Sequence, residues 1–194
     1  MNIEYPDGAT PIDPDEAAGL KLPHITTRGE LDRWEQENII HAIAWLDKTN
    51  PKDILNESFV RALHHRMFDE VWIWAGRFRK SDKNIGGPWF QVPISVRALC
   101  DDAELWVELK SEPPTDIAVR FHHRLVSIHP FPNGNGRHAR LMTDLLLENR
   151  LGEARFTWGS EDLSKAGTVR HRYIVALQAA DSHDYGPLRH FVRT

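Results

Sequence analysis

Cysteine is nearly absent from this chain of 194 residues, and Cys100 is its only example. One cysteine excludes an internal disulfide and a cysteine-based zinc cluster, and it favours a reducing compartment. We interpret Cys100 as a small apolar side chain of the core.

A surplus of basic charge is also lacking, because the formal net charge is -4 and the isoelectric point is near 6.2. Such a balance exerts no global attraction on DNA, RNA or an acidic membrane surface, so any basic site must be local. Neither nucleic acid nor a membrane is an expected partner.

Long apolar runs are missing as well. The first residues, Met1–Gly8, have neither the basic start nor the apolar stretch of a signal peptide, and no later run approaches membrane length. Hydrophobic residues make up 41% of the chain, which is enough for one compact core and short for two. We expect a single cytoplasmic domain.

The apolar residues that are present recur mostly with a helical period. Residues 1–27 carry four prolines among acidic and small residues, which is typical of an extended arm. The spacing of Thr27 and Glu30 matches a capping box, and the period that follows predicts a first helix over about 28–47. A second helix is predicted within about 51–76. Further helices are predicted at about 95–110, 115–127, 136–149 and 168–180.

One stretch departs from this helical pattern. Residues 85–93, Ile-Gly-Gly-Pro-Trp-Phe-Gln-Val-Pro, mix turn formers with bulky β-formers, which predicts a short exposed β-hairpin. The expected fold class is therefore mostly α, with one small β element.

The segment from His129 to Arg140 holds the most distinctive chemistry: His-Pro-Phe-Pro-Asn-Gly-Asn-Gly-Arg-His-Ala-Arg. Its prolines and glycines bend the backbone tightly, so that successive N–H groups converge just ahead of a helix that begins near Gly136. Arg137 and Arg140 lie on neighbouring faces of the first turn. Cations are normally disfavoured at a helix N-terminus, so their presence there indicates a strong anion such as a polyphosphate.

This segment resembles the signature of the Fic family, His-x-Phe-x-Asp/Glu-Gly-Asn-Gly-Arg-x-x-Arg, at every defined position except Asn133. Upstream, Val71–Arg79 resembles the family's Trp-Ala-Gly-aromatic-Arg stretch, which precedes its hairpin flap. The resemblance covers most of residues 50–190. It implies a Fic-type helical bundle over residues 28–194 and a protein nucleotidyltransferase that uses ATP.

The resemblance also implies roles for single residues. His129 would be the general base that takes a proton from a Ser, Thr or Tyr hydroxyl of a target protein. Ordinary packing is the alternative for Tyr173. The implied nucleotide-binding residues, besides Asn133, are Gly134, Asn135, Gly136, Arg137 and Arg140 on the phosphates, with Tyr173 and Asp181 near the base and ribose.

Asn133 is the one departure from the signature. The family's acidic residue at this position helps to hold Mg²⁺, and Asn133 offers one neutral carbonyl oxygen instead. We expect weaker metal affinity with activity retained, because a Mg²⁺ held by triphosphate oxygens accepts a neutral ligand or a water. Loss of catalysis is the alternative.

Aromatic residues serve two expected purposes. The predicted flap combines Gly86 and Gly87 with Trp89 and Phe90, and the family uses this flap to hold the target as an added strand, so exposed aromatics there would mean binding. The other tryptophans fall mostly at apolar-periodic positions and are expected in the core.

The eleven histidines do not predict a metal centre. Adjacent pairs such as His64 and His65 point to different faces of a helix, so solvated or core positions are expected. A zinc site on His129 and His138 would need a third ligand, and nothing local supplies one.

Many Fic proteins carry an inhibitory helix with Ser/Thr-x-x-x-Glu-Gly/Asn, whose glutamate pairs with the second arginine of the motif. Glu37, followed by Asn38, fits the end of this pattern, although Arg33 stands in place of Ser or Thr. Glu30, four residues after Thr26, is the alternative candidate. A solvated helix glutamate without regulatory function fits equally well, and control by a separate antitoxin is a further alternative.

We therefore expect an enzyme that moves AMP from ATP to a hydroxyl of a target protein. One rival is a Fic-fold enzyme that transfers a phosphate or another part of the nucleotide, because the loop positions phosphates without specifying the phosphorus attacked. The other rival is a non-catalytic module that binds nucleotide or captures a partner strand through Trp89 and Phe90. Intact His129, Arg137 and Arg140 favour catalysis.

Overall fold

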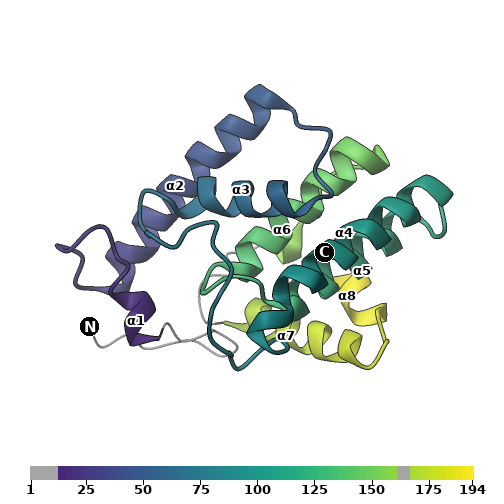
Figure 1. Cartoon of the computed structure of the whole chain (residues 1–194). Coiled ribbons are helices and arrows are strands. Elements are labelled where there is room, and N and C mark those ends of the chain that lie inside the picture. The colour runs from purple at the N-terminus through teal and green to yellow at the C-terminus, as the bar shows by residue number, and fades with distance from the viewer. Residues whose placement is uncertain (1–12, 161–166) are drawn as a thin grey trace.

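The computed structural model describes residues 13–160 and 167–194, and within these ranges the regular structure is helical apart from one isolated antiparallel bridge, Leu20 to Trp72. The mostly α character expected from the sequence is confirmed. The α-helices are α1 (Pro14–Ala17), α2 (Arg28–Thr49), α3 (Glu57–Phe68), α4 (Val92–Leu109), α5 (Pro114–Ile128), α6 (Asn135–Leu146), α7 (Thr168–Asp181) and α8 (Gly186–Phe191) (Figure 1). Shorter turns of other helix types are η1 (Trp89–Gln91), η2 (Leu147–Leu151) and η3 (Trp158–Ser160).

Local sequence sets where the first long helices begin and end. The Thr27 side chain accepts from the N–H of Glu30, and the Glu30 carboxylate accepts from the N–H of Thr27 at 3.0 Å, so the expected capping box starts α2. Asn56 caps α3 by accepting from the N–H of Phe59 at 2.8 Å. Asn50 ends α2 in the left-handed conformation, with φ 40°.

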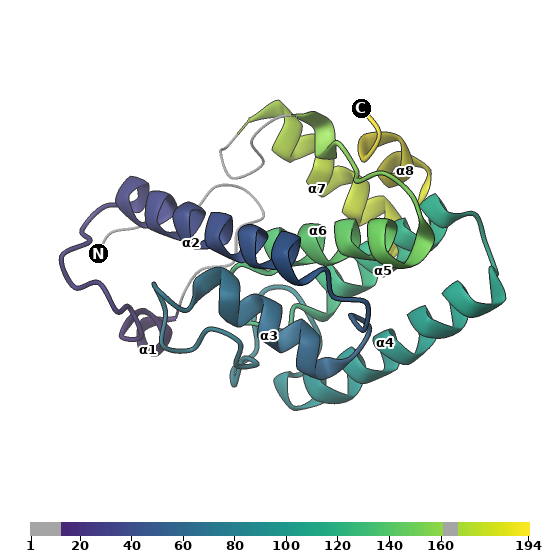
Figure 2. The same cartoon turned by 90° about the horizontal axis from the view of Figure 1, so that it is seen from above.

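Two hydrophobic clusters hold the helices together. The larger joins α2, α3 and α4 to one side of α5 and α6, with Leu31, Leu63 and Met142 fully buried. The smaller lies between the other side of α5 and the pair α7 and α8, around Ala118 and Tyr173. Figure 2 shows α5 and α6 in the middle, with α2 and α3 on one side and α7 and α8 on the other. The start of α6, where the motif loop ends, is therefore central in the molecule.

The β-hairpin predicted for residues 85–93 is not formed. This part of the described chain contains turns, η1 and the first residues of α4. Pro93 lies in the first turn of α4, where a backbone N–H would have no intrahelical acceptor and where the fixed φ of proline fits the helix. Val92, Val96 and Leu99 are buried at helical spacing, so packing of a helix outweighs the β-propensity of the aromatic residues before it.

Other element boundaries also differ from the prediction. The second helix stops at Phe68, because Asn38 of α2 occupies the turn that follows: its amide donates to the carbonyl of Arg66 at 3.0 Å and accepts from the N–H of Glu70 at 2.9 Å. After α6 the chain continues as a π-helical turn, η2. Helix α8 is too short to show a period in the sequence and was not predicted.

Part of the arm predicted to be extended is folded onto the domain. Residues 1–12 lie outside the described residues. From Asp13 the chain forms α1, again with a capping box, between Asp13 and Glu16. It then runs beside the α3 end, where the N–H of Lys21 donates to the carbonyl of Val71 at 2.8 Å.

Individual side chains largely occupy the expected environments. Cys100 is buried, and burial raises the pKa of its thiol to about 12, as suits an inert core residue. Trp34 is an exception among the tryptophans expected in the core, because 40% of it is exposed. Within the described residues, no helix is both long enough and apolar enough to cross a bilayer.

Candidate active site

His129 ends α5 in the left-handed conformation, with φ 53° and ψ 60°. Few residues other than glycine adopt this conformation, and it is often found at functional sites. The N–H of His129 still donates to the carbonyl of Leu125 at 3.3 Å, and the residue is buried. The chain therefore leaves the helix abruptly at His129 and enters the loop of residues 130–134.

A buried arginine fastens this turn to the predicted flap. Arg79 donates from Nε to the carbonyl of His129 at 2.8 Å, and its two terminal nitrogens donate to the carbonyls of Ser81 at 2.9 Å and Gly87 at 2.6 Å. A Cβ at Gly86 would lie 2.7 Å from Arg79 Nη2 and 3.1 Å from His129 Cβ, so only glycine fits there. Gly86 and Gly87 thus pack close to His129.

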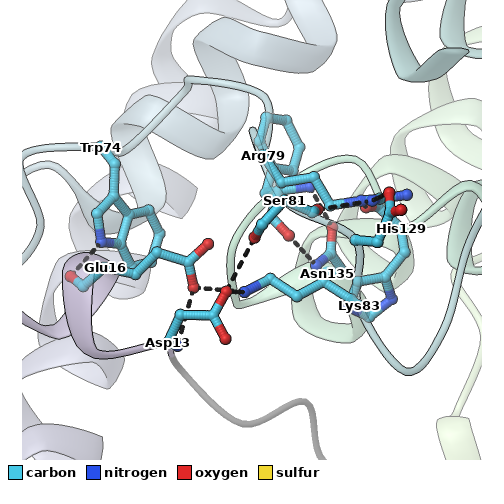
Figure 3. Close-up of polar contacts among 10 residues, drawn as sticks. Asp13, Glu16, Trp74, Arg79, Ser81, Lys83, His129 and Asn135 are labelled. Atoms are coloured by element: carbon cyan, nitrogen blue, oxygen red, sulfur yellow. Dashed lines mark hydrogen bonds and ion pairs between the residues drawn. The ribbon is translucent and has the colours of Figure 1, made fainter. Parts of the chain in front are cut away.

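Lys83 lies between the α1 segment and His129 (Figure 3). Its Nζ donates to Asp13 Oδ2 and Glu16 Oε2, both at 2.6 Å, and its side chain is only 2% exposed. The Ser81 hydroxyl donates to the same Asp13 oxygen at 2.9 Å, and the hydrogen bonds from Lys83 and Ser81 lower the pKa of Asp13. The N-terminal segment is therefore tied directly to the chain that covers His129.

The environment of His129 disfavours its charged form. Burial, followed by the positive charge of Arg79, lowers the pKa of His129 to about 4, while a hydrogen bond with the backbone of Val126 opposes this effect and Lys83 adds to it. The imidazole is therefore neutral at pH 7, which is the form that can accept a proton.

Three side chains hold the interior of the loop. Phe131 is fully buried, and its ring stacks on His64 with the centroids 3.7 Å apart. The Asn135 side chain clamps Phe131, accepting from its N–H at 2.9 Å and donating to its carbonyl at 2.8 Å. The amide of Asn135 thus serves the loop, and its contribution to a phosphate would come from the backbone N–H.

His64 fixes the loop further along. Its Nδ1 accepts from the N–H of Gly76 at 3.0 Å, so the ring proton is on Nε2, which donates to the carbonyl of Asn133 at 3.0 Å. Burial, and then the nearby His138, lower the pKa of His64 well below its usual value, so this tautomer persists at neutral pH. Histidines of such pairs were expected either in solvent or in the core, and His64 lies in the core.

Glycines shape the start of α6. Gly134 has φ 77°, and a Cβ on it would lie 2.5 Å from the ring of Phe68. At Gly136, by contrast, the nearest atom to a Cβ would be Arg140 Nη1 at an ordinary 3.7 Å, so the fold itself does not require glycine. Because the first N–H groups of a helix have no intrahelical partner, the bare backbone at Gly136 leaves room for an anion to approach.

Asn133 precedes this turn and is engaged within it. Its Oδ1 accepts from the N–H of Gly134 at 2.6 Å. An amide oxygen can accept a hydrogen bond or act as a neutral ligand to a cation. Among the described residues, no group of three or more His, Cys, Asp or Glu side chains could hold a metal ion.

The two motif arginines have different partners. Arg137 Nη2 forms an ion pair with Glu35 Oε2 of α2 at 2.8 Å, and the other Glu35 oxygen accepts from the indole N–H of Trp72 at 2.7 Å. Arg140 instead faces the hydroxyl of Tyr173 as a hydrogen-bonding partner, and burial lowers the pKa of Arg140 without removing its charge. The first arginine is therefore paired with a carboxylate, whereas the hydrogen-bonding partner of the second is a neutral hydroxyl.

The glutamates proposed as inhibitory occupy other places. Glu37 lies exposed on α2, and it is Glu35 of the same helix that forms an ion pair with a motif arginine, Arg137. Glu30 is half-buried and caps α2. The sequence does hold a signal for Glu35, because it stands four residues after Leu31 and four before Ile39, on the buried stripe of α2.

Tyr173 and Asp181 lie on α7 and contact histidines of α5. The Tyr173 hydroxyl is 2.7 Å from His122 Nε2, and Asp181 Oδ1 is 2.8 Å from His123 Nε2. Tyr173 is buried, whereas the Asp181 side chain is largely exposed. The structure thus brings Tyr173 to the motif through Arg140, and it pairs Asp181 with His123 instead.

The predicted flap presents apolar side chains to solvent although it is not a hairpin. Trp89 is 43% exposed and Phe90 is 62% exposed, and Ile94 on the next turn is exposed as well. Beside them lies a cleft of about 410 Å³ between the start of α4 and the end of α5, with Ile128 in its wall. Ile128 directly precedes His129 in the chain, and Arg79, which holds the His129 carbonyl, lines the same cleft.

The family model described as Fic/DOC matches residues 54–147. The protein adenylyltransferase Fic of Aedes aegypti is 30% identical over 147 residues, which are 74% of this chain and 28% of that protein. The one from Drosophila ananassae is 36% identical over 145 residues, which are 73% and 26% of the two chains. The chain thus spans little more than a quarter of these relatives.

Solved structures show the same fold. The N-terminal Fic domain of the Bep8 protein from Bartonella sp. 1-1C superposes with a TM-score of 0.68 at 17% identity, over 87% of this chain and 86% of that one. Residues 134–508 of Fic-1 from C. elegans superpose with a TM-score of 0.63 at 24% identity, over 80% and 46%. The chain therefore has a mostly helical Fic fold and carries a Fic/DOC family domain that is distantly homologous to protein adenylyltransferase Fic.

Proposed function

We propose that this protein is an adenylyltransferase that moves AMP from ATP to a hydroxyl side chain of a target protein. One observation carries the proposal: a single short loop joins a buried, neutral histidine to the start of a helix that bears two arginines. Such a loop supplies a proton acceptor and an anion site within a few residues of each other, as transfer from a triphosphate requires.

His129 acts as the general base. Its lowered pKa keeps the imidazole neutral at physiological pH, so it can take the proton from the attacking hydroxyl without first losing its own. The oxygen then attacks the α-phosphorus, and pyrophosphate departs on the opposite side. Arg79 holds the His129 carbonyl, which keeps the strained turn in place during the reaction.

The phosphates bind at the start of α6. The backbone N–H groups of Asn135, Gly136 and Arg137 and the positive end of the helix dipole attract the triphosphate. Arg140 holds the outer phosphates as a full cation. Arg137 joins it once the triphosphate replaces Glu35 as its partner.

Mg²⁺ enters with the nucleotide. A carboxylate-rich cage is not formed by the described residues, and Asn133 would offer a neutral amide oxygen to a Mg²⁺ brought in by the triphosphate. The ion, when bound, neutralises triphosphate charge. The target binds across Trp89 and Phe90, whose exposure on the segment that follows Gly86 and Gly87 suits a hydrophobic contact.

The test uses ATP labelled at the α- or the γ-phosphate, incubated with the protein and a mixture of candidate target proteins. Adenylyl transfer labels protein from α-labelled ATP only. Transfer of the γ-phosphate reverses the pattern, and a non-catalytic module labels nothing. His129→Ala is the control, expected to abolish labelling while nucleotide binding persists, because other groups form the phosphate site. Repeating the reaction with GTP, CTP and UTP tests the choice of base.

A further inference from the structure

The side chains behind Arg140 form a chain of buried polar groups that the proposed chemistry does not use. The chain runs from Thr143 of α6 through His122 of α5 to Tyr173 of α7. All three residues are buried, and Tyr173 leads to Arg140. Three helices therefore meet at one arginine of the motif.

The direction of each hydrogen bond follows from its neighbours. The Thr143 hydroxyl donates to the carbonyl of Ala139 at 2.7 Å, so its oxygen can only accept from His122 Nδ1, 3.3 Å away. His122 thus carries its proton on Nδ1, and its Nε2 is a bare acceptor. The Tyr173 hydroxyl, 2.7 Å from Nε2, must then donate to it.

This direction determines what Arg140 meets. Because the phenol proton points to His122, the lone pairs of the Tyr173 oxygen are left for the guanidinium. Burial, together with the charge of Arg140, lowers the pKa of His122 to about 3, so His122 does not take up a proton that would reverse the chain at physiological pH.

A neutral partner has a different effect from a carboxylate. Glu35 both orients Arg137 and cancels its charge. Tyr173 orients Arg140 but leaves the full charge available to a ligand. Besides Tyr173, the carboxylate of Asp144 acts on Arg140. The two oxygens of this carboxylate accept hydrogen bonds from the indole N–H of Trp158, at 3.0 and 3.2 Å.

We propose that His122 and Tyr173 are positioning residues, which hold the Arg140 guanidinium through a neutral hydroxyl as an oriented cation for the terminal phosphate of a triphosphate. The proposal rests on the proposed function for the identity of the ligand. It assigns to Tyr173 a role at the phosphate end of the site, where the family resemblance had implied the base and ribose.

The experiment compares the affinities for ATP and AMP, measured by calorimetry, in the parent and in Tyr173→Phe. This variant keeps the ring and removes only the hydroxyl. Because a hydrogen bond to a charged group is worth roughly a factor of ten or more, ATP affinity should fall about tenfold. AMP lacks the outer phosphates, so its affinity should stay within about twofold. Tyr185→Phe, at a tyrosine beside His123, is the matched control.

A double-mutant cycle separates positioning from general damage. In an Arg140→Ala background, Tyr173→Phe should have no further effect on the ratio of ATP to AMP affinity. His122→Gln offers a different hydrogen-bonding geometry to the Tyr173 hydroxyl, so it should also lower the affinity for ATP. This variant replaces Tyr173→Phe in the experiment if Tyr173→Phe does not fold. Thermal unfolding identifies any variant that is not folded.

Several results would overturn the proposal. Equal losses for ATP and AMP in Tyr173→Phe would show a merely structural role, and an unchanged ATP affinity would remove Tyr173 from the site. An effect that persists without Arg140 would break the link between them, and failure of the parent to bind any triphosphate would exclude the phosphate role. Binding without transfer would refute the adenylyltransferase proposal alone, because calorimetry does not require turnover.

Discussion

The ion pair between Glu35 and Arg137 predicts that Glu35→Gln will destabilise the ligand-free protein and increase its affinity for ATP. The pair is 2.8 Å long, and the Glu35 side chain is only 2% exposed. Removing one member of a buried pair costs about 3–5 kcal/mol, because the other charge is left without a partner. Glutamine keeps an oxygen for the indole N–H of Trp72, so we expect the lower end, about 3 kcal/mol.

For a chain of this size, about 3 kcal/mol corresponds to a fall in Tm of roughly 6–12 °C without ligand. A bound triphosphate returns a partner to Arg137, and the parent must break its ion pair to gain the same contact. ATP should therefore bind the variant at least about tenfold more tightly, which is about 1.4 kcal/mol.

The assay is thermal unfolding with and without ATP, followed by calorimetry of ATP binding. Glu37→Gln is the matched control, because Glu37 lies on the exposed side of the same helix and should leave Tm and affinity unchanged. Weaker ATP binding by Glu35→Gln would refute the reasoning, since it would mean that Glu35 prepares Arg137 for the phosphates instead of competing with them.

Three further predictions follow from the loop. Because the free base must be neutral, kcat/KM should stay constant below pH 6.5, the usual histidine pKa, and fall only toward about pH 4; a fall centred near 6.5 would contradict the lowered pKa of His129. Asn133→Asp should raise transfer most at low Mg²⁺, and an unchanged Mg²⁺ dependence would exclude this residue from the metal site. Gly134→Ala should destabilise the protein by roughly 2–4 kcal/mol in urea unfolding, since it adds a clash with Phe68 to the strain of positive φ. Gly152→Ala is the control: it introduces the strain of positive φ, but no atom lies near the added Cβ, so it should cost only about 1–2 kcal/mol of stability. Equal losses of stability in the two variants would refute the clash with Phe68.

The sequence predicts local features of this fold better than those that depend on distant contacts. The capping box of Thr27 and the helix after the motif loop are encoded within a few residues, and both are found. The hairpin and the length of the second helix were wrong, because packing of α4 and the amide of Asn38 decide them.

The same distinction holds for the site. The motif identifies His129 and the two arginines, whose chemistry is local to the loop. It does not identify Glu35, Lys83 or His122, because each contacts the loop from a segment remote in sequence. For Glu35 the helical stripe held a usable signal, but the family pattern drew attention to the exposed neighbour, Glu37.

The contact between Lys83 and the α1 segment bears on where this domain can be cut. A shortened protein that keeps only residues 54–147, the range matched by the family model, would lose both carboxylates that hold Lys83. It would leave a buried ammonium group near His129 and further disfavour protonation of the base. Biochemical work on isolated Fic regions of this chain should therefore begin no later than Asp13, because residues outside the recognisable motif set the electrostatics within it.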